Sequence, residues 1–175
     1  MQRRTLVSVS LFLVAGTAAA SLGGCGFALR QAPDFAFSTL YSGLPESSPL
    51  GVELRRSLEA TRKVRVIRDA RQINEAQVIL DVLTDQREKV VLSRNSAGQV
   101  REFQLRTRFR FKLRTPAGQE LIPATELLLA REISFTESLV LSKEAEEGLL
   151  YRDMQSDIVQ QLMRRLAAVD KSQLP

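Results

Sequence analysis

The segment from residue 102 to residue 113 alternates between apolar and polar side chains more regularly than any other part of the chain. One side carries Phe103, Leu105, Thr107, Phe109, Phe111 and Leu113. The other side carries Glu102, Gln104, Arg106, Arg108, Arg110 and Lys112. Because successive side chains of a strand point to opposite faces, this pattern predicts a strand with one core face and one basic face. Such a strand needs apolar elements that cover one side of its sheet.

Further strands and turns are predicted around this segment. The hairpin tip is predicted at 94–98, where the sequence is Arg-Asn-Ser-Ala-Gly, and a second turn at 115–118, Thr-Pro-Ala-Gly. The remaining strand segments are 35–41, 64–67, 78–92 and 127–135. In the first of them, the alternation places Phe35, Phe37, Thr39 and Tyr41 on one side.

Two amphipathic helices are also predicted. The first begins at Ser48-Pro49, an N-cap followed by a proline at the first helical position, and ends near Thr61. Its apolar stripe is Leu50, Leu54 and Leu58. The second begins at Ser142, and its expected buried stripe is Leu150, Met154, Ile158, Leu162 and Leu166. Charges suited to the helix dipole are Glu144, Glu146 and Glu147 near its start and Arg164, Arg165 and Lys171 at its end.

These elements predict an α+β fold, a two-layer sandwich of two helices on a mixed, mainly antiparallel sheet of about four strands. The expected organisation is a cleaved signal peptide at 1–24, a lipidated tether at 25–34, one domain at 35–170 and a flexible end at 171–175. Apart from the signal peptide, the chain has the length of one domain with a sizeable core.

The amino terminus has the order of a secretory signal. Arg3 and Arg4 precede an apolar stretch from Leu6 to Ala20, and Leu22-Gly23-Gly24 then stand directly before Cys25, the only cysteine. This sequence resembles the bacterial lipobox, which implies cleavage before Cys25 and acylation of that residue. An uncleaved membrane anchor is the alternative, although the small residues at its end insert poorly. An aspartate after the cysteine would favour inner-membrane retention, so Gly26 favours the outer membrane.

The composition argues against an enzyme. There is no histidine, which removes the side chain best suited to proton transfer near neutral pH and the His-dependent zinc sites and catalytic triads. No phosphate-binding glycine loop occurs. We therefore expect no catalytic residue, no metal and no cofactor beyond the lipid on Cys25. A hydrolase that uses paired carboxylates is a remote alternative. The net charge of +5 is too small for a general nucleic-acid binder.

Several short motifs together resemble one family. They are Cys25-Gly26-Phe27-Ala28-Leu29-Arg30, the helix start Pro49-Leu50, Arg94-Asn95 followed by Phe103-Gln104-Leu105, Ser142-Lys143, and Leu162-Met163-Arg164-Arg165-Leu166. In series they are similar to the LptE family, the lipopolysaccharide-assembly lipoproteins of Gram-negative bacteria. The resemblance implies an α/β sandwich that plugs the large outer-membrane β-barrel LptD in a 1:1 complex and binds lipopolysaccharide. A free-standing periplasmic lipoprotein that binds an anionic glycan or lipid is the alternative.

The resemblance also implies functional residues. Arg94 and Lys143 match positions where the family presents basic residues, so both are expected to bind lipopolysaccharide phosphates. Their alternative is an ordinary role as solvated charges. The row of Arg106, Arg108, Arg110 and Lys112 is not part of the resemblance. It is a secondary basic surface for which solvent, a barrel wall and an anionic ligand all remain open.

Overall fold

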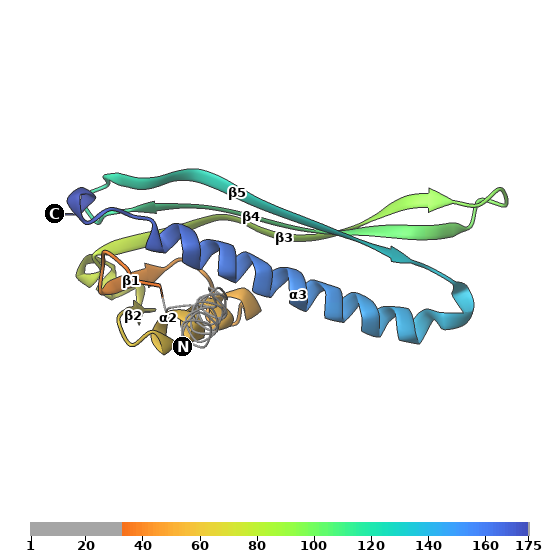
Figure 1. Ribbon diagram of the computed structural model, residues 1–175, viewed down its shortest axis with the longest axis horizontal. Coiled ribbons are helices and arrows are strands. Elements are labelled where there is room, and N and C mark those ends of the chain that lie inside the picture. The colour runs from red at the N-terminus through yellow and green to blue at the C-terminus, as the bar shows by residue number, and fades with distance from the viewer. Residues whose placement is uncertain (1–32, 175) are drawn as a thin grey trace, which may run out of the picture. The chain divides into compact units, whose positions relative to one another are not determined.

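Five strands form one mixed sheet in the computed structural model, which describes residues 33–174 (Figure 1). Their order is β2-β1-β3-β4-β5. The bounds are β1 Thr39–Ser42, β2 Arg65–Ile67, β3 Val78–Arg94, β4 Val100–Arg114 and β5 Glu120–Ser134. β1 pairs in parallel with β2 and β3, whereas β3, β4 and β5 are antiparallel. The mixed, mainly antiparallel sheet is confirmed, with five strands and not about four, because the short β2 pairs beside β1 as an edge strand.

The first strand is shorter than the predicted segment 35–41. The backbone N–H of Ser38 donates to Oε1 of Gln77 at 2.6 Å. This N–H is therefore bonded to a side chain and not to the backbone of a neighbouring strand. Phe37, which precedes β1, and Leu40, which belongs to β1, both lie in the main core. Tyr41 packs on the opposite face of the sheet. The loose alternation predicted for this segment, which placed Tyr41 on the same side as Phe37, is therefore wrong at Tyr41.

The first predicted helix is confirmed as α2, Pro49–Ala60. Oγ of Ser48 accepts a hydrogen bond from the N–H of Gly51 at 3.2 Å and caps the helix. The stripe of Leu50, Leu54 and Leu58 is buried.

The second helix, α3, spans Val140–Ala167 and follows the 3₁₀ turn η3 at Glu137–Leu139. It begins two residues before Ser142, whose hydroxyl donates to the carbonyl of Leu139 at 2.9 Å. The first turn then contains no acidic residue, so the predicted glutamates lie beyond the turn where the dipole acts most strongly. Its stripe is confirmed, since Met154, Ile158, Leu162 and Leu166 are fully buried and Leu150 is half-buried.

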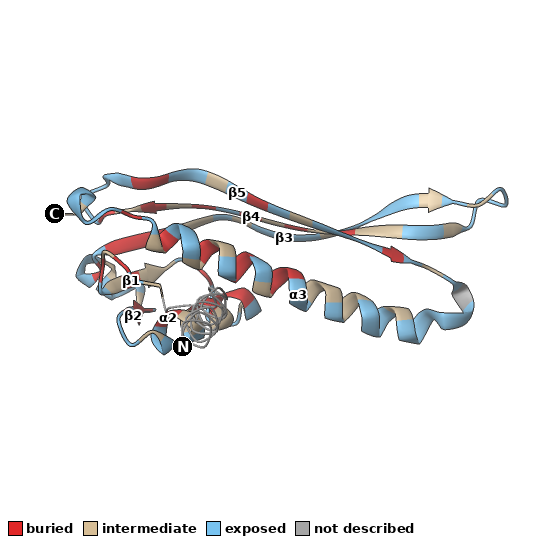
Figure 2. Ribbon diagram, in the orientation of Figure 1, coloured by how far each residue is buried: buried red, intermediate tan, exposed pale blue. Residues whose placement is uncertain are grey.

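Both helices cover the same face of the sheet. Figure 2 shows buried residues on α3 and on several strands of the sheet. Phe109, Phe111 and Leu113 of β4 share one core cluster with the apolar stripes of both helices. A second cluster joins Leu105, Ile133 and Met154. On the opposite face, Ile67, Ala76 and Ile79 form a small cluster beside the 3₁₀ turn η2, Ala70–Glu75. The predicted two-layer α+β sandwich is confirmed.

Glycines occupy both predicted turns, and a 3₁₀ turn lies near the carboxyl end. Gly98 and Gly118 have φ of +80° and +93°, as glycine permits at the two predicted turns. The compact part begins at Pro33. Lys171–Gln173 form the 3₁₀ turn η4, capped by Asp170, and Leu174 packs against the main core. The flexibility expected for residues 171–175 stays a prediction.

Candidate functional site

The predicted site residues fall in three places. Cys25, the predicted lipidation site, lies outside the described residues. Arg94 and Lys143 lie at what we call the distal end, which comprises the hairpin tip 94–100 and residues 134–147. Figure 1 shows the hairpin tip and the start of α3 towards the same end of the sheet. A surface hollow lies between the hairpin tip and the segment that precedes α3, and its lining includes Asn95, Arg101, Phe135 and Thr136 but neither Arg94 nor Lys143.

Arg94 is exposed at the hairpin tip, as predicted. Its Nη1 donates to the carbonyl of Gly98 at 3.1 Å, within the same turn. The Asn95 side chain organises that turn by accepting from the N–H groups of Ala97 and Gln99 at 3.0 and 2.9 Å. No acid of the described residues pairs with Arg94, so its guanidinium keeps donors available for a phosphate.

Lys143 is less accessible than its predicted position implies. Its Nζ donates to Oγ of Ser134 at 3.0 Å and to Oε2 of Glu146 at 2.8 Å. Its side chain is only 18% exposed. No hydrogen bond joins Lys143 to Arg94, so the structure brings the two residues to one end without placing them in one cluster.

A pocket of about 260 Å³ lies beside Lys143. Its apolar lining includes Phe103, Ile133 and Phe135, whose two phenyl rings meet edge to face at 5.3 Å. Lys89 lies at this pocket with Nζ 2.6 Å from Glu147 and 4.4 Å from the centre of the Phe103 ring. The sequence analysis did not identify Lys89. Its place on the core-facing side of β3, opposite Leu105, was a signal that a residue of α3 would pair with its charge.

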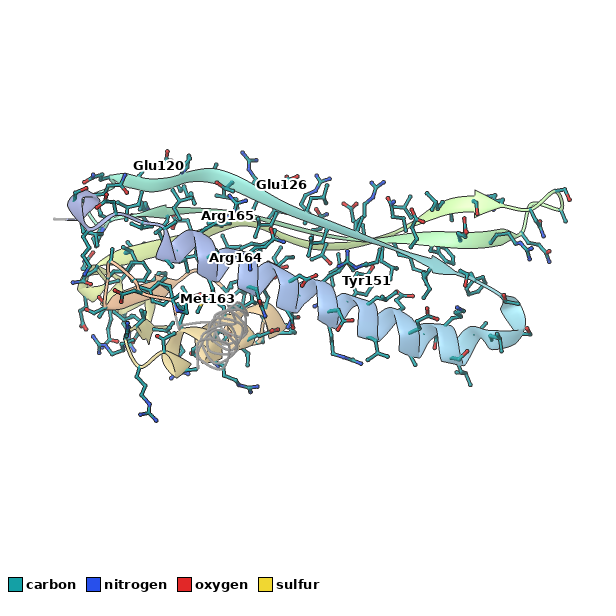
Figure 3. The ribbon with its side chains drawn as sticks, in the orientation of Figure 1. Glu120, Glu126, Tyr151, Met163, Arg164 and Arg165 are labelled. Carbon is teal, nitrogen blue, oxygen red and sulfur yellow. The ribbon has the colours of Figure 1, made fainter. Side chains whose placement is uncertain are left out.

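A partly buried polar network joins β3 to α3. Arg87 donates to Oε1 of Gln155 at 2.8 Å, and its guanidinium carbon lies 5.4 Å from the ring centre of Tyr151. The Tyr151 hydroxyl donates to the carbonyl of Glu88 at 2.8 Å, and Figure 3 shows Tyr151 between α3 and the sheet. Burial raises the pKa of Tyr151, and the charge of Glu147 raises that pKa further, against the opposing effect of Arg87.

The predicted basic row lies on the face of β4 that is turned away from α2 and α3. Nε of Arg106 donates to Oε1 of Gln104 at 2.6 Å, and Lys112 lies 3.8 Å from Asp81. Nε of Arg108 is shielded from solvent with no hydrogen-bond acceptor among the described residues. Such a donor costs about 1–3 kcal/mol.

Other kinds of site find no support in residues 33–174. No group of three or more acidic or other metal-ligating side chains gathers there. No helix in this range is both long and apolar enough to span a membrane.

Residues 37–166 match the family model LptE, described as lipopolysaccharide-assembly. The chain belongs to the LptE family. The LPS-assembly lipoprotein LptE of Pectobacterium atrosepticum is 26% identical over 163 residues, which cover 92% of this chain and 86% of that protein. Membership in the LptE family confirms the resemblance and assigns the protein a general role in lipopolysaccharide assembly.

Solved structures agree with the LptE-family fold. Uncharacterized lipoprotein B of Nitrosomonas europaea is 33% identical with a TM-score of 0.69, over 82% of this chain and 91% of that chain. Rare lipoprotein B of Shewanella oneidensis is 22% identical with a TM-score of 0.61, over 74% and 92%. The second likeness shows the fold alone.

Proposed function

We propose that this protein is a lipid-anchored outer-membrane subunit that plugs an LptD-like β-barrel, supports its assembly and binds lipopolysaccharide during insertion into the outer leaflet. The observation that carries the proposal is the LptE family match over residues 37–166, which includes most of both helices and all five strands. The lipid on Cys25 would hold the protein on the periplasmic side of the membrane, while the domain occupies the barrel lumen in a 1:1 complex. The role is non-catalytic and involves no nucleic acid.

The distal end supports the ligand part of this proposal. Arg94 is exposed with no acidic partner, and arginine can bind phosphate through two parallel hydrogen bonds. Lys143 would have to exchange Glu146 for a phosphate oxygen, because its Nζ already lies 2.8 Å from that carboxylate. Arg94 is therefore the primary contact in this proposal, and Lys143 is a second contact that Glu146 restrains.

Co-expression with the LptD barrel of the same organism tests the proposal. The tagged full chain is purified from detergent-solubilised outer membranes, and the molar ratio of the two proteins is measured. We expect a stable complex at one to one. A chain that purifies as a monomer contradicts the proposal and favours a free-standing lipoprotein that binds an anionic glycan or lipid.

A further inference from the structure

Three arginines form a continuous row on the sheet face opposite α2 and α3, which we call the outer face. Residues paired directly across strands share a face. On the outer face, Arg106 lies between Glu88 and Ala130, Arg108 between Gln86 and Leu128, and Arg110 between Thr84 and Glu126.

The guanidinium groups of this row lack ionic partners within the described residues. Arg108 and Arg110 make no hydrogen bond or ion pair there, and Arg106 bonds only the neutral Gln104. Nearby cations behave differently, since Arg114 reaches Asp81 at 2.7 Å. The three arginines therefore present unused donors along the middle strand of β3, β4 and β5.

The surroundings of the row distinguish between kinds of partner. Carboxylates flank it on both sides, with Glu88 on β3 and Glu126 and Glu132 on β5. Figure 3 shows Glu126 on the side of the sheet turned away from α3. These three carboxylates oppose the approach of a ligand that carries many phosphates. A protein surface can instead place single carboxylates between them.

Exposed apolar side chains on the outer face also favour a protein partner over a phosphate-rich ligand. Leu128, directly beside Arg108, is 50% exposed, and Val90 on the same face is 40% exposed. Arginine is enriched at the centres of protein interfaces, and burial of the exposed aliphatic groups beside it would add to the stability of a contact with a protein. The lumen of a membrane β-barrel is polar, so its wall can supply carboxylates for the arginines.

We propose that the outer face, centred on Arg108, docks against a carboxylate-bearing wall of the barrel partner. This inference rests on the proposed function and adds the surface of contact. It assigns Arg106, Arg108 and Arg110 to contact with the barrel and not with lipopolysaccharide.

The test uses two charge-reversal variants of the full lipidated chain, each co-expressed with the LptD barrel. One is Arg106→Glu/Arg108→Glu/Arg110→Glu, and the control is Arg56→Glu/Arg164→Glu/Arg165→Glu, three exposed arginines on the helices. We expect the outer-face variant to lower recovery of the barrel at least about tenfold, since breaking close charge pairs is costly. The control should retain the barrel, and both variants should bind lipopolysaccharide as the wild type does.

A photo-crosslinking residue at Leu128 gives a second measurement that needs no charge reversal. We expect a crosslink to the barrel from position 128. Absence of that crosslink, full recovery of the barrel by the outer-face variant, equal loss in both variants, or loss of lipopolysaccharide binding alone would each overturn the assignment. Failure of the wild type to recover the barrel is a separate result, which overturns the proposed function and the partner with it.

Discussion

Nε2 of Gln155 donates to Oε2 of Glu53 at 2.6 Å, which joins α3 to α2 across 102 positions of sequence. The other oxygen of the same carboxylate, Oε1, accepts from the hydroxyl of Ser156 at 2.7 Å. On its far side Gln155 accepts from Arg87 of β3. One buried amide thus connects both helices with the sheet.

The change Glu53→Ala should lower the free energy of unfolding by about 1–3 kcal/mol, because it leaves the amide of Gln155 without its acceptor. Urea unfolding measures this loss. Asp153→Ala, an exposed change on α3, is the control and should stay within about 0.5 kcal/mol. Equal stability of the two variants would show that the Glu53 contact contributes nothing.

Ile158→Ala should cost about 2–5 kcal/mol, because Ile158 is fully buried in the main core and the change leaves a cavity. The midpoint and slope of urea unfolding provide the measurement. A loss under about 0.5 kcal/mol, which is usual for surface positions, would mean that this stripe does not support the core.

Local patterns were sufficient to predict most of the fold. Ser48 and Pro49 determine where α2 begins through contacts within the helix itself. The alternation of β4 needed no knowledge of its neighbours, and its inward residues Leu105, Phe109 and Phe111 are fully buried. The start of α3 was misplaced because Leu139 stands at its N-cap position without a side-chain cap bond, so the sequence carries no local signal there.

The contacts between distant elements were not predictable. Gln155 meets Glu53 and Arg87 only because the fold brings three elements together. The restraint on Lys143 was missed in part for the same reason, since Ser134 belongs to the end of β5. Arg94 was placed correctly at an exposed tip because its surroundings lie within one hairpin.

Stability above about pH 10 should depend on Tyr151. Burial raises its pKa above the ordinary 10.0, so in the unfolded chain the phenol loses its proton at lower pH than in the folded protein. Its stabilising effect is therefore fully present below pH 10.0 and is lost as the pH rises through the folded value. The difference in unfolding free energy between wild type and Tyr151→Phe should shrink over this range. Parallel curves would contradict this origin of the pH dependence.

Cys25→Ser should block acylation and leave the unprocessed precursor, because a serine oxygen does not replace the sulfur nucleophile. Mass spectrometry of the amino terminus distinguishes the precursor from the acylated, cleaved form. We expect the domain to fold without lipid, since residues 33–174 contain both helices and all five strands. An unmodified Cys25 thiol in the wild type would contradict the lipoprotein assignment.

Release of Lys143 should strengthen ligand binding. Glu146→Gln removes the carboxylate that holds Nζ at 2.8 Å and should raise the affinity for lipopolysaccharide, whereas Glu144→Gln is the neighbouring control with the same change in charge. Titration of each variant with lipopolysaccharide measures the difference. An equal rise in both variants would indicate a general effect of net charge and not release of Lys143.

Binding of lipopolysaccharide by Arg94→Asp/Lys143→Asp tests the central claim most directly. Each lost charge-assisted contact with phosphate should be worth roughly 1.5–3 kcal/mol, so affinity should fall by roughly two or more decades while the barrel complex still forms. Arg106→Asp/Arg110→Asp is the charge-matched comparison and should bind lipopolysaccharide as the wild type does. If only the Arg106 and Arg110 variant loses binding, the outer face is the ligand surface and the assignment of Arg94 and Lys143 is wrong.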